Sequence, residues 1–459
     1  MKALLTAGTW KWAIVVIGTL APLAFPLPLI QQLFLCITFW AILIWAFDLI
    51  QYAVTAILLP VLYVLFGICT PDVAFGGWLS SAAWITLGGL LFGYAFMQSG
   101  LSRRIAYKMI TLTKGDFKGI IISLALTCLV ITPVIPSVMG KVILMVPVAI
   151  EICNALNLKK GDRTAGAIML VVFFALWSPK MAFPTASTDS ILATNVLVDQ
   201  YHYPISWLEW TADMFIPALL WTAVSVGLVY FLKPAKVQLD KQESIERYNN
   251  LGPMSGQEKK LAVMMLLTVI LFATESLHGV DPAYIMVIVA AICFIPWMKL
   301  LEPSDFQKTD FSVVFFLTGA VSIGGVAAHL GIVDTIVNTS SSLLAGQSDF
   351  FLVIALYIFS IVTNFLLNPM ALIATLLGPI TEVCMQLGYS PVLGAYSMIM
   401  GFNQALFPYQ IAPFMLIYSY GYLKMGPLVK VMAIRIGVGV IFTALITYPY
   451  WCVVGLVTY

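Results

Sequence analysis

Long apolar runs separated by short polar turns fill most of the chain. A helix that crosses a bilayer needs roughly 20 apolar residues, so runs of this length predict an all-α polytopic membrane protein. We expect eleven spans, near residues 12–29, 32–50, 52–69, 84–100, 164–197, 211–232, 261–277, 283–298, 311–329, 391–420 and 431–452.

Two further apolar stretches contain helix-breaking residues. Residues 131–150 read ITPVIPSVMGKVILMVPVAI, and residues 363–381 include NFLLNPMALIATLLGPI. Non-helical backbone is tolerated at membrane depth only where protein or a water-filled cavity satisfies its polar groups. We therefore predict two re-entrant hairpins that line a site.

The sequence also contains an internal repeat. A shift of 231 residues brings Gly88 onto Gly319 and Ser137 onto Asn368. On the expected layout the two glycine-rich spans cross the membrane in opposite directions, which is the inverted repeat of secondary transporters. We predict a first span at 1–30, a first repeat at 31–232, a cytoplasmic linker at 233–260 and a second repeat at 261–459, with about five spans and one hairpin in each repeat.

Each predicted hairpin is followed by a span interrupted by prolines. Pro179 and Pro184 lie within residues 164–197, and Pro408 and Pro413 lie within residues 391–420. In inverted-repeat transporters the substrate site lies near the midplane, where broken helices meet. We expect the site of this chain between the two hairpins and the two broken helices.

The distribution of charge predicts the orientation. Hydrophobic residues make up 61% of the chain and charged residues 10%. On the expected layout the outer loops contain no Lys or Arg, which places the N-terminus in the cytoplasm and the C-terminus outside, in a bacterial inner membrane. Arg435 is expected to reach the inner surface by snorkelling. Lys141 and Lys180 are the two cations expected to stay within the membrane.

Several function classes are not expected. The seven cysteines are scattered singly, so the sequence predicts neither a disulfide framework nor a zinc site. We find no pattern of a water-exposed nucleophile and base, and therefore expect no enzyme. We also expect membrane lipid as a partner but no nucleic acid, and no resident cofactor.

Four segments together resemble a known family. GLSRRIA, NNLGPMSGQEKKLAV, HGVDPA and DFSVVFFLTGAVSIGG are similar to sequences of the divalent-anion sodium symporter family, whose members carry di- and tricarboxylates, such as citrate, or sulfate. The resemblance implies a homodimer of eleven spans per protomer. It also implies a scaffold domain and a transport domain that moves like an elevator.

The hairpin tips depart from the family pattern. In that family each tip carries a Ser-Asn-Thr triplet that contributes to sodium and carboxylate binding. Here Ser137-Val138-Met139 stands in the first tip, and Pro369-Met370-Ala371, preceded by Asn368, stands in the second. Val, Met and Pro offer no side-chain oxygen, so sodium coupling is not expected.

The two membrane lysines are open to two interpretations. A lysine at the bilayer centre costs roughly 2.5–3.5 kcal/mol, so each needs a partner or water. Either lysine could be a fixed cation for an anionic substrate; alternatively, Lys180 pairs with Asp189 and Lys141 snorkels to the base of its hairpin. The candidate substrate-binding residues are Ser137, Val138, Met139, Lys141, Lys180, Thr185, Ser187, Thr188, Asn368, Pro369, Met370 and Gln410, and the coupling-ion candidates are Asp189 and Ser190.

We expect a secondary active transporter of organic anions, above all di- or tricarboxylates, that works by alternating access as a sodium-independent exchanger. A sodium- or proton-coupled symporter of carboxylates or sulfate is the alternative within transport. A passive channel or a structural membrane subunit is the alternative from another class.

Overall fold

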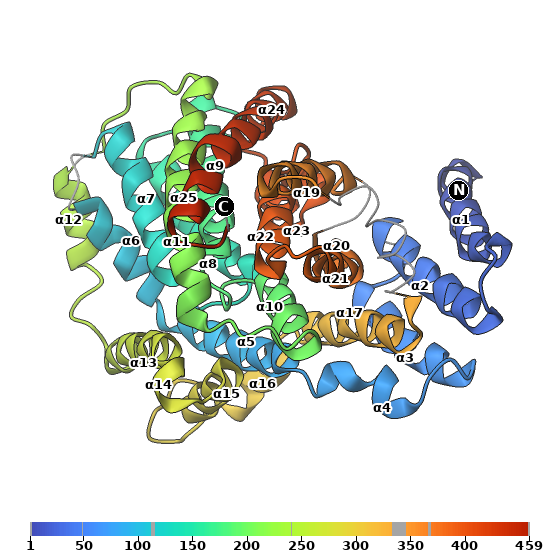
Figure 1. The fold of residues 1–459 in the computed structure, drawn as a ribbon. Coiled ribbons are helices and arrows are strands. Elements are labelled where there is room, and N and C mark those ends of the chain that lie inside the picture. The colour runs from blue at the N-terminus through green and yellow to red at the C-terminus, as the bar shows by residue number, and fades with distance from the viewer. Residues whose placement is uncertain are drawn as a thin grey trace.

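The computed structural model describes residues 2–47, 49–111, 115–239, 241–332, 346–365 and 369–457, and within these ranges the chain forms helices and turns but no strand. Figure 1 shows the helices running in several directions, with α1 at the edge of the molecule. The first half comprises α1 (Lys2–Leu20), α2 (Leu29–Phe47), α3 (Tyr52–Leu65), α4 (Pro71–Ala74), α5 (Ser81–Ser99), α6 (Leu101–Thr111), α7 (Phe117–Ile131), α8 (Val138–Ala155), α9 (Arg163–Trp177), α10 (Thr188–Asn195) and α11 (Trp207–Gly227).

The second half repeats the order of long, re-entrant and interrupted helices. It comprises α12 (Lys241–Asn249), α13 (Gly256–Ala273), α14 (Glu275–His278), α15 (Pro282–Cys293), α16 (Pro303–Lys308), α17 (Ser312–His329), α19 (Asp349–Thr363), α20 (Pro369–Leu372), α21 (Gly378–Gln386), α22 (Pro391–Phe402), α23 (Ala412–Ser419), α24 (Met425–Phe442) and α25 (Tyr448–Val453).

The helices have the length and apolarity of membrane spans. Five segments of the described chain could each cross a membrane alone, and several shorter apolar helices lie at other predicted spans. The all-helical polytopic fold is thereby confirmed, whereas the count of eleven spans stays a prediction. The five segments are Val138–Ala155, Arg163–Ala182, Trp207–Leu232, Ser312–His329 and Met425–Val453.

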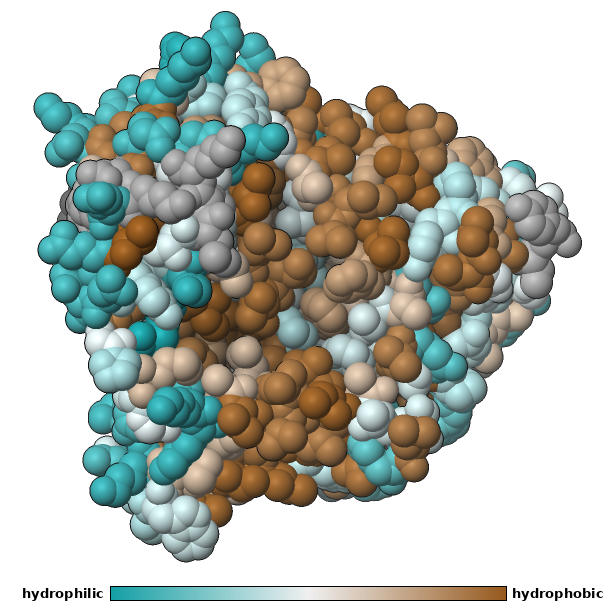
Figure 2. Space-filling view, turned by 90° about the vertical axis from the view of Figure 1, so that its left-hand side faces the viewer, coloured by the Kyte–Doolittle hydropathy of each residue, from teal (hydrophilic) through white to brown (hydrophobic). Residues whose placement is uncertain are grey.

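The surface carries an apolar band. Figure 2 shows hydrophobic residues across the middle of one face, with hydrophilic residues gathered at its sides. On α7, exposed Ile122, Leu126 and Val130 recur every four residues, while Ile120, Leu124 and Cys128 are buried on the opposite side. Residues four apart share one helix face, so α7 turns one apolar face outward, as a helix in contact with lipid does.

Two glycines bring helices of the two halves into close contact. A Cβ atom at Gly88 would lie 2.8 Å from the backbone oxygen of Met286, because α5 packs directly on α15. A Cβ atom at Gly319 would lie 2.6 Å from the backbone oxygen of Ala56, because α17 packs directly on α3. Gly319 follows Gly88 by 231 residues and Met286 follows Ala56 by 230. This exchange of partners is what two repeats related by a two-fold axis produce.

The first hairpin consists of α7, a non-helical tip at residues 132–137, and α8. Both arms meet α6 at the end opposite the tip: Ser123 of α7 donates to the carbonyl of Met109 at 3.1 Å, and Glu151 of α8 pairs with Arg103 at 3.0 Å. The predicted range 131–150 contains the reversal and part of α8, while α7 is an additional arm. Pro147 does not end α8, since neighbouring groups can compensate for a proline within a membrane helix.

The segment predicted as the second hairpin is described in two parts, and both predicted broken helices are interrupted. After α19, residues 366–368 lie outside the described ranges, and the chain then continues through α20, a π-helical turn at Ile373–Leu377, and α21. The first broken helix consists of α9 and α10, and the second of α22 and α23. The structure therefore has breaks within both predicted segments, 164–197 and 391–420.

A face of small residues on α5 receives the first hairpin tip. A Cβ atom at Gly89 would overlap the ring of Pro136, and one at Gly93 would lie 3.4 Å from Ile135. The absence of side chains at these glycines lets the tip approach the α5 backbone. The tip is thereby held between α5 and the broken helices.

Candidate functional site

Lys141 lies in the first turn of α8 and points into the protein. Ser137 caps this helix by accepting a hydrogen bond from the amide of Gly140 at 3.1 Å. The Nζ atom of Lys141 donates to the carbonyl of Ala186 at 2.7 Å and approaches that of Thr132 at 3.5 Å, and the side chain is fully buried. The predicted snorkelling of Lys141 is therefore wrong, since its ammonium binds carbonyls of the tip and of the break after α9.

Lys180 and Asp189 form a buried ion pair across the first break. The Nζ atom of Lys180 also lies 3.6 Å from the centre of the Trp177 ring, a distance at which the ring face attracts a cation. Lys141 binds the carbonyl of Ala186, which lies between these two residues along the chain. The cluster of Lys141, Lys180 and Asp189 carries one net positive charge when all three are ionised.

Each break is hydrogen-bonded to the hairpin segment of its own half, and one of these bonds recurs in both halves. Thr185 donates from Oγ1 to the carbonyl of Pro133 at 2.9 Å. Gln410 donates from Nε2 to the carbonyl of Asn364 at 3.0 Å. Asn364 follows Pro133 by 231 residues, so the two bonds are equivalent under the repeat. Both donors, predicted to bind substrate, instead hold the start of a hairpin tip against a break.

The two breaks are tied to each other by a reciprocal pair of bonds. Trp177 donates from its indole to the carbonyl of Asn403 at 2.9 Å, and the Asn403 amide donates back to the carbonyl of Trp177 at 2.8 Å. Trp177 is the last residue of α9, and Asn403 directly follows α22. The broken helices therefore meet where each is interrupted, between the two halves.

Arg435 of α24 binds this junction and is fully buried. Its guanidinium donates to the side chains of Asn403 at 2.7 Å, Gln404 at 3.0 Å, Ser178 at 3.1 Å and Ser225 at 3.0 Å, and to the carbonyl of Asn403 at 2.9 Å. The prediction that Arg435 snorkels to the inner surface is wrong, because these oxygens satisfy it inside the protein.

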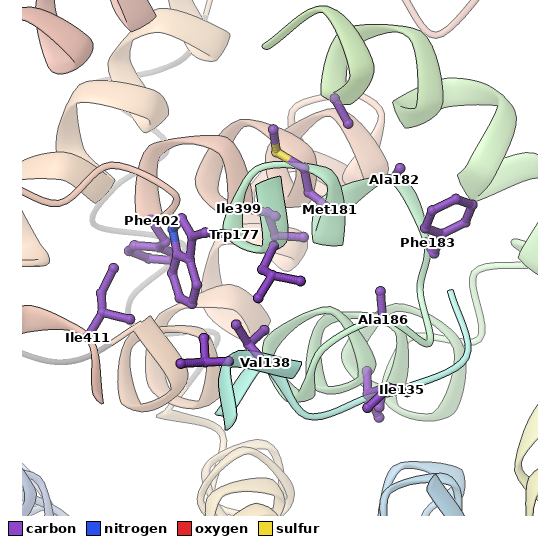
Figure 3. Close-up of a cluster of buried hydrophobic side chains, with 14 of the residues drawn as sticks. Ile135, Val138, Trp177, Met181, Ala182, Phe183, Ala186, Ile399, Phe402 and Ile411 are labelled. Atoms are coloured by element: carbon purple, nitrogen blue, oxygen red, sulfur yellow. The ribbon is translucent and has the colours of Figure 1, made fainter. Parts of the chain in front are cut away.

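Apolar side chains surround the tip and the breaks. Figure 3 shows Val138 of the first hairpin close to Trp177 of the first broken helix and Phe402 of the second, while Ile135 of the same hairpin lies beside Ala186 of the first break. All five are buried. Within a low-dielectric surrounding of this kind, the field of a fixed charge is screened less than in water.

The remaining predicted residues lie in the same region. Ser187 and Ser190 share a hydrogen bond of 2.9 Å between their hydroxyls, and Asn368 lies outside the described ranges. Four of the predicted residues are only partly buried: Ser137, Met139, Thr188 and Met370. Two others, Val138 and Pro369, are buried.

Sequence reasoning missed the residues that join the two halves. Ser178, Asn403 and Gln404 stand next to the predicted breaks, so their position could have marked them. Arg435 carried the clearest signal, since a charge within an apolar span is unfavourable without a partner. The nearby Lys430 made an inner membrane boundary plausible there, which led to the wrong assignment.

The sequence is similar to a known protein family and to several named transporters. The sequence model of the family described as "Sodium:sulfate symporter transmembrane region" matches residues 3–457. The chloroplastic dicarboxylate transporter 1 of Spinacia oleracea is 24% identical over 339 residues, which cover 71% of this chain but only 59% of the spinach protein. The L-tartrate/succinate antiporter of Shigella dysenteriae is 23% identical over 401 residues, which cover 81% of this chain and 78% of that protein.

Two solved structures share the fold. The YdaH transporter of Alcanivorax borkumensis superposes with a TM-score of 0.54 at 15% identity, covering 84% of this chain and 88% of that one. MtrF of Neisseria gonorrhoeae superposes with a TM-score of 0.51 at 14% identity, covering 81% and 80%. At such low identity the likeness extends to the fold alone.

Proposed function

Because the chain belongs to the sodium:sulfate symporter transmembrane family, we propose that it is a secondary transporter that exchanges dicarboxylates across a bacterial inner membrane without sodium. The names of its relatives support this substrate class, since they include dicarboxylate transporters and a tartrate/succinate antiporter. Their names do not distinguish exchange from symport for this chain, so the coupling is argued from its own residues.

The observation that carries the proposal is the position of Lys141. In transporters with discontinuous helices, carbonyls of unwound segments coordinate the coupling cation, while half-helix N-termini face the anionic substrate. Here the Lys141 ammonium occupies two such carbonyls, of Thr132 and Ala186. A charge held on the chain takes the role that a dissolved cation has in a symporter.

The substrate anion would bind beside Lys141, at the tip of the first hairpin. The N-terminal ends of α8 and α10 carry partial positive charge and free amide groups, which attract carboxylates. Ser137 and Thr188 lie at these helix starts and are only partly buried. We assign direct substrate contact to these two residues and to Lys141.

A tethered cation favours exchange over net transport. It cannot leave with the substrate, so the empty carrier retains an uncompensated buried charge, which is costly in a membrane. The substrate site therefore moves from one side of the membrane to the other more readily when an anion is bound. Trading one dianion for another returns it through the membrane without this cost.

A thermal-shift screen tests the substrate class. A ligand that binds only the folded protein raises the melting temperature as its concentration exceeds the dissociation constant. Succinate, tartrate and citrate should each be compared with sulfate and phosphate in sodium-free buffer. A shift with a dicarboxylate is expected, and no shift with any organic acid would contradict the proposal.

Counterflow distinguishes a carrier from a channel or a structural subunit. Proteoliposomes loaded with unlabelled succinate should accumulate labelled succinate above its external concentration for a limited time. A channel lets label equilibrate but does not drive such accumulation. Equilibration alone would favour the channel, and no flux at all would favour a structural subunit.

The family's elevator motion is part of the proposal, with the hairpins and broken helices moving against α5. A Cβ atom at Gly93 would lie 3.4 Å from Cγ2 of Ile135, across this boundary. A disulfide between Gly93→Cys and Ile135→Cys should stop exchange, and reductant should restore it. Undiminished exchange by fully crosslinked protein would contradict a sliding boundary.

The orientation and the homodimer are proposed from the sequence. A cysteine in place of Leu79, whose side chain is 84% exposed, should react with an impermeant reagent from outside, and one in place of Lys236 only from inside. Light scattering should give twice the 50.3 kDa protomer mass after subtraction of detergent. The reverse labelling, or a monomer mass, would contradict the respective part.

A further inference from the structure

Arg435 is a buried cation whose hydrogen bonds all go to neutral oxygens, and its guanidinium also lies 4.9 Å from the centre of the Trp221 ring and 5.2 Å from that of Phe174. Its five hydrogen bonds use hydroxyls of Ser178 and Ser225, side-chain oxygens of Asn403 and Gln404, and the carbonyl of Asn403. No ion pair of the described chain includes it. A buried charge without an opposite charge is unfavourable, so its presence calls for a physical reason.

Besides the two ring faces, Arg435 touches two helix ends. Ser178 directly follows the last residue of α9, and Asn403 directly follows the last residue of α22. A helix C-terminus carries roughly half a negative charge from its aligned peptide dipoles. Arg435 therefore lies against two partial negative charges, one from each half of the protein.

These helix ends adjoin the proposed anion site. Trp177, the last residue of α9, is bonded to Asn403 and lies beneath the Lys180 ammonium. Lys180 and Lys141 both lie at the first break, since Lys180 pairs with Asp189 and Lys141 donates to the carbonyl of Ala186. A negative potential at the α9 and α22 ends would therefore repel an anion bound beside Lys141.

We propose that Arg435 is a positioning residue that also neutralises the C-terminal ends of both broken helices, and thereby lets a dianion bind where these helices meet. This inference rests on the proposed function. In carriers with broken helices such C-terminal ends hold a coupling cation, and Arg435 supplies a permanent one. It acts on the substrate through its charge and through Ser178 and Asn403, without touching the substrate.

The two effects of Arg435 can be separated because charge and geometry act differently on related ligands. Succinate carries two negative charges, and succinamate, its monoamide, has nearly the same shape with one. A change in potential at the site acts in proportion to ligand charge. It should therefore weaken succinate binding by about the square of the factor for succinamate, whereas a distorted site has no reason to follow this relation.

The test places a carboxylate beside Arg435 without removing the arginine. Ser178→Asp would pair with the guanidinium, and Ser178→Asn is a neutral control of the same size. We expect Ser178→Asp to weaken the binding of both ligands, and the fold-loss in affinity for succinate should be about the square of the fold-loss for succinamate. The preference for the dianion over the monoanion therefore falls. The Asn variant should keep the preference of the natural protein in the same thermal-shift titration.

A second pair of variants covers the case in which Ser178→Asp does not fold. Arg435→Lys retains the charge and should retain the preference for succinate even where overall affinity falls. Arg435→Gln should lose that preference. An equal loss for both ligands in Ser178→Asp or Arg435→Gln would overturn the inference and leave Arg435 a purely structural residue.

The outcome also separates this inference from the proposed function. Failure of the natural protein to bind succinate would count against dicarboxylate transport itself. Binding of succinate by the natural protein, with an unchanged dianion preference in Ser178→Asp and Arg435→Gln, would count against the role of Arg435 alone.

Discussion

The two halves of the site share backbone geometry but differ in charge. In both halves a side chain of the break holds the start of the hairpin tip, Thr185 on Pro133 and Gln410 on Asn364. The charged side chains carried by a hairpin or a break, Lys141, Lys180 and Asp189, belong to the first half, whereas residues 364–381 and 402–420 of the second half contain no charged side chain. Backbone carbonyls and helix ends thus converge in a similar way in both halves. The side chains at the matching positions determine which groups bind there.

A cationic side chain binds each of the two breaks, but the two side chains come from different helices. Lys141 comes from the hairpin of its own half and binds the carbonyls of Thr132 and Ala186. At the second break the cation is Arg435, which comes from α24 and binds the carbonyl of Asn403. At each break, a backbone carbonyl left free by the interruption of the helix accepts a hydrogen bond from one of these cations.

The largest expected effect is that of Lys141→Ala. It removes the ammonium that we place beside the substrate, so exchange should be abolished or sharply weakened in counterflow at equal reconstituted protein. The unpaired carbonyl of Ala186 costs roughly 1–3 kcal/mol of stability, so the melting temperature must be measured alongside. Lys118→Ala, on the exposed side of α7, is the matched control and should exchange normally.

If Lys141→Ala exchanges normally, the charge difference between the halves does not explain exchange. Lys141 would then be a structural residue that binds the tip to the break.

Asp189→Asn should have the next largest effect, this time on stability. It leaves Lys180 buried and unpaired, and breaking a buried pair costs roughly 3–5 kcal/mol. The exposed pair of Arg103 and Glu151, with side chains 52% and 32% accessible, is the control, since Glu151→Gln there should cost about 1 kcal/mol or less. Equal midpoints of unfolding in detergent for the two variants would contradict a tightly held Lys180 pair.

Gly88→Ala and Gly319→Ala sharpen the comparison of the halves. Each added methyl meets backbone across a helix contact, of α15 and α3 respectively, and overpacking typically costs roughly 1–3 kcal/mol. Gly437→Ala, where nothing lies within 4 Å, should be neutral or stabilising because Ala favours the helix. A loss of stability confined to one of the two contact glycines would argue against equivalent packing.

Thr185→Val should have the smallest effect of the series on exchange. It removes the bond to the Pro133 carbonyl and the bond that Thr185 accepts from the indole of Trp207 at 3.1 Å, and each hydrogen bond is worth about 0.5–1.5 kcal/mol net. Exchange should persist if the residue only holds the tip in place. Loss of exchange with unchanged stability would instead mean that Thr185 contacts the substrate.

Local sequence was sufficient to predict the interruptions. Prolines within apolar runs located the breaks near Pro184 and Pro408, and the register of Gly88 with Gly319 pointed to two glycines that each lie at a close helix contact. These features act on the backbone at the position where they occur, so a single sequence reveals them. The first arm of the hairpin, α7, was missed because an unbroken apolar helix looks the same whether it spans or returns.

The contacts that assemble the site could not be predicted in this way. Arg435 binds Ser178 and Ser225, which precede it by 257 and 210 residues, and no periodic pattern connects positions so far apart. Thr185 and Gln410 were assigned to substrate because they carry donors. Only the folded chain shows that each donor already has a carbonyl partner.

The central claim is that a charge on the chain replaces sodium, and replacing sodium by choline in counterflow tests it most directly. Vesicles loaded with unlabelled succinate should take up labelled succinate at the same rate in either salt, and empty vesicles should take up little in both. A steep rise of counterflow with sodium, or strong sodium-driven uptake into empty vesicles, would contradict the account and make the protein a sodium-coupled symporter.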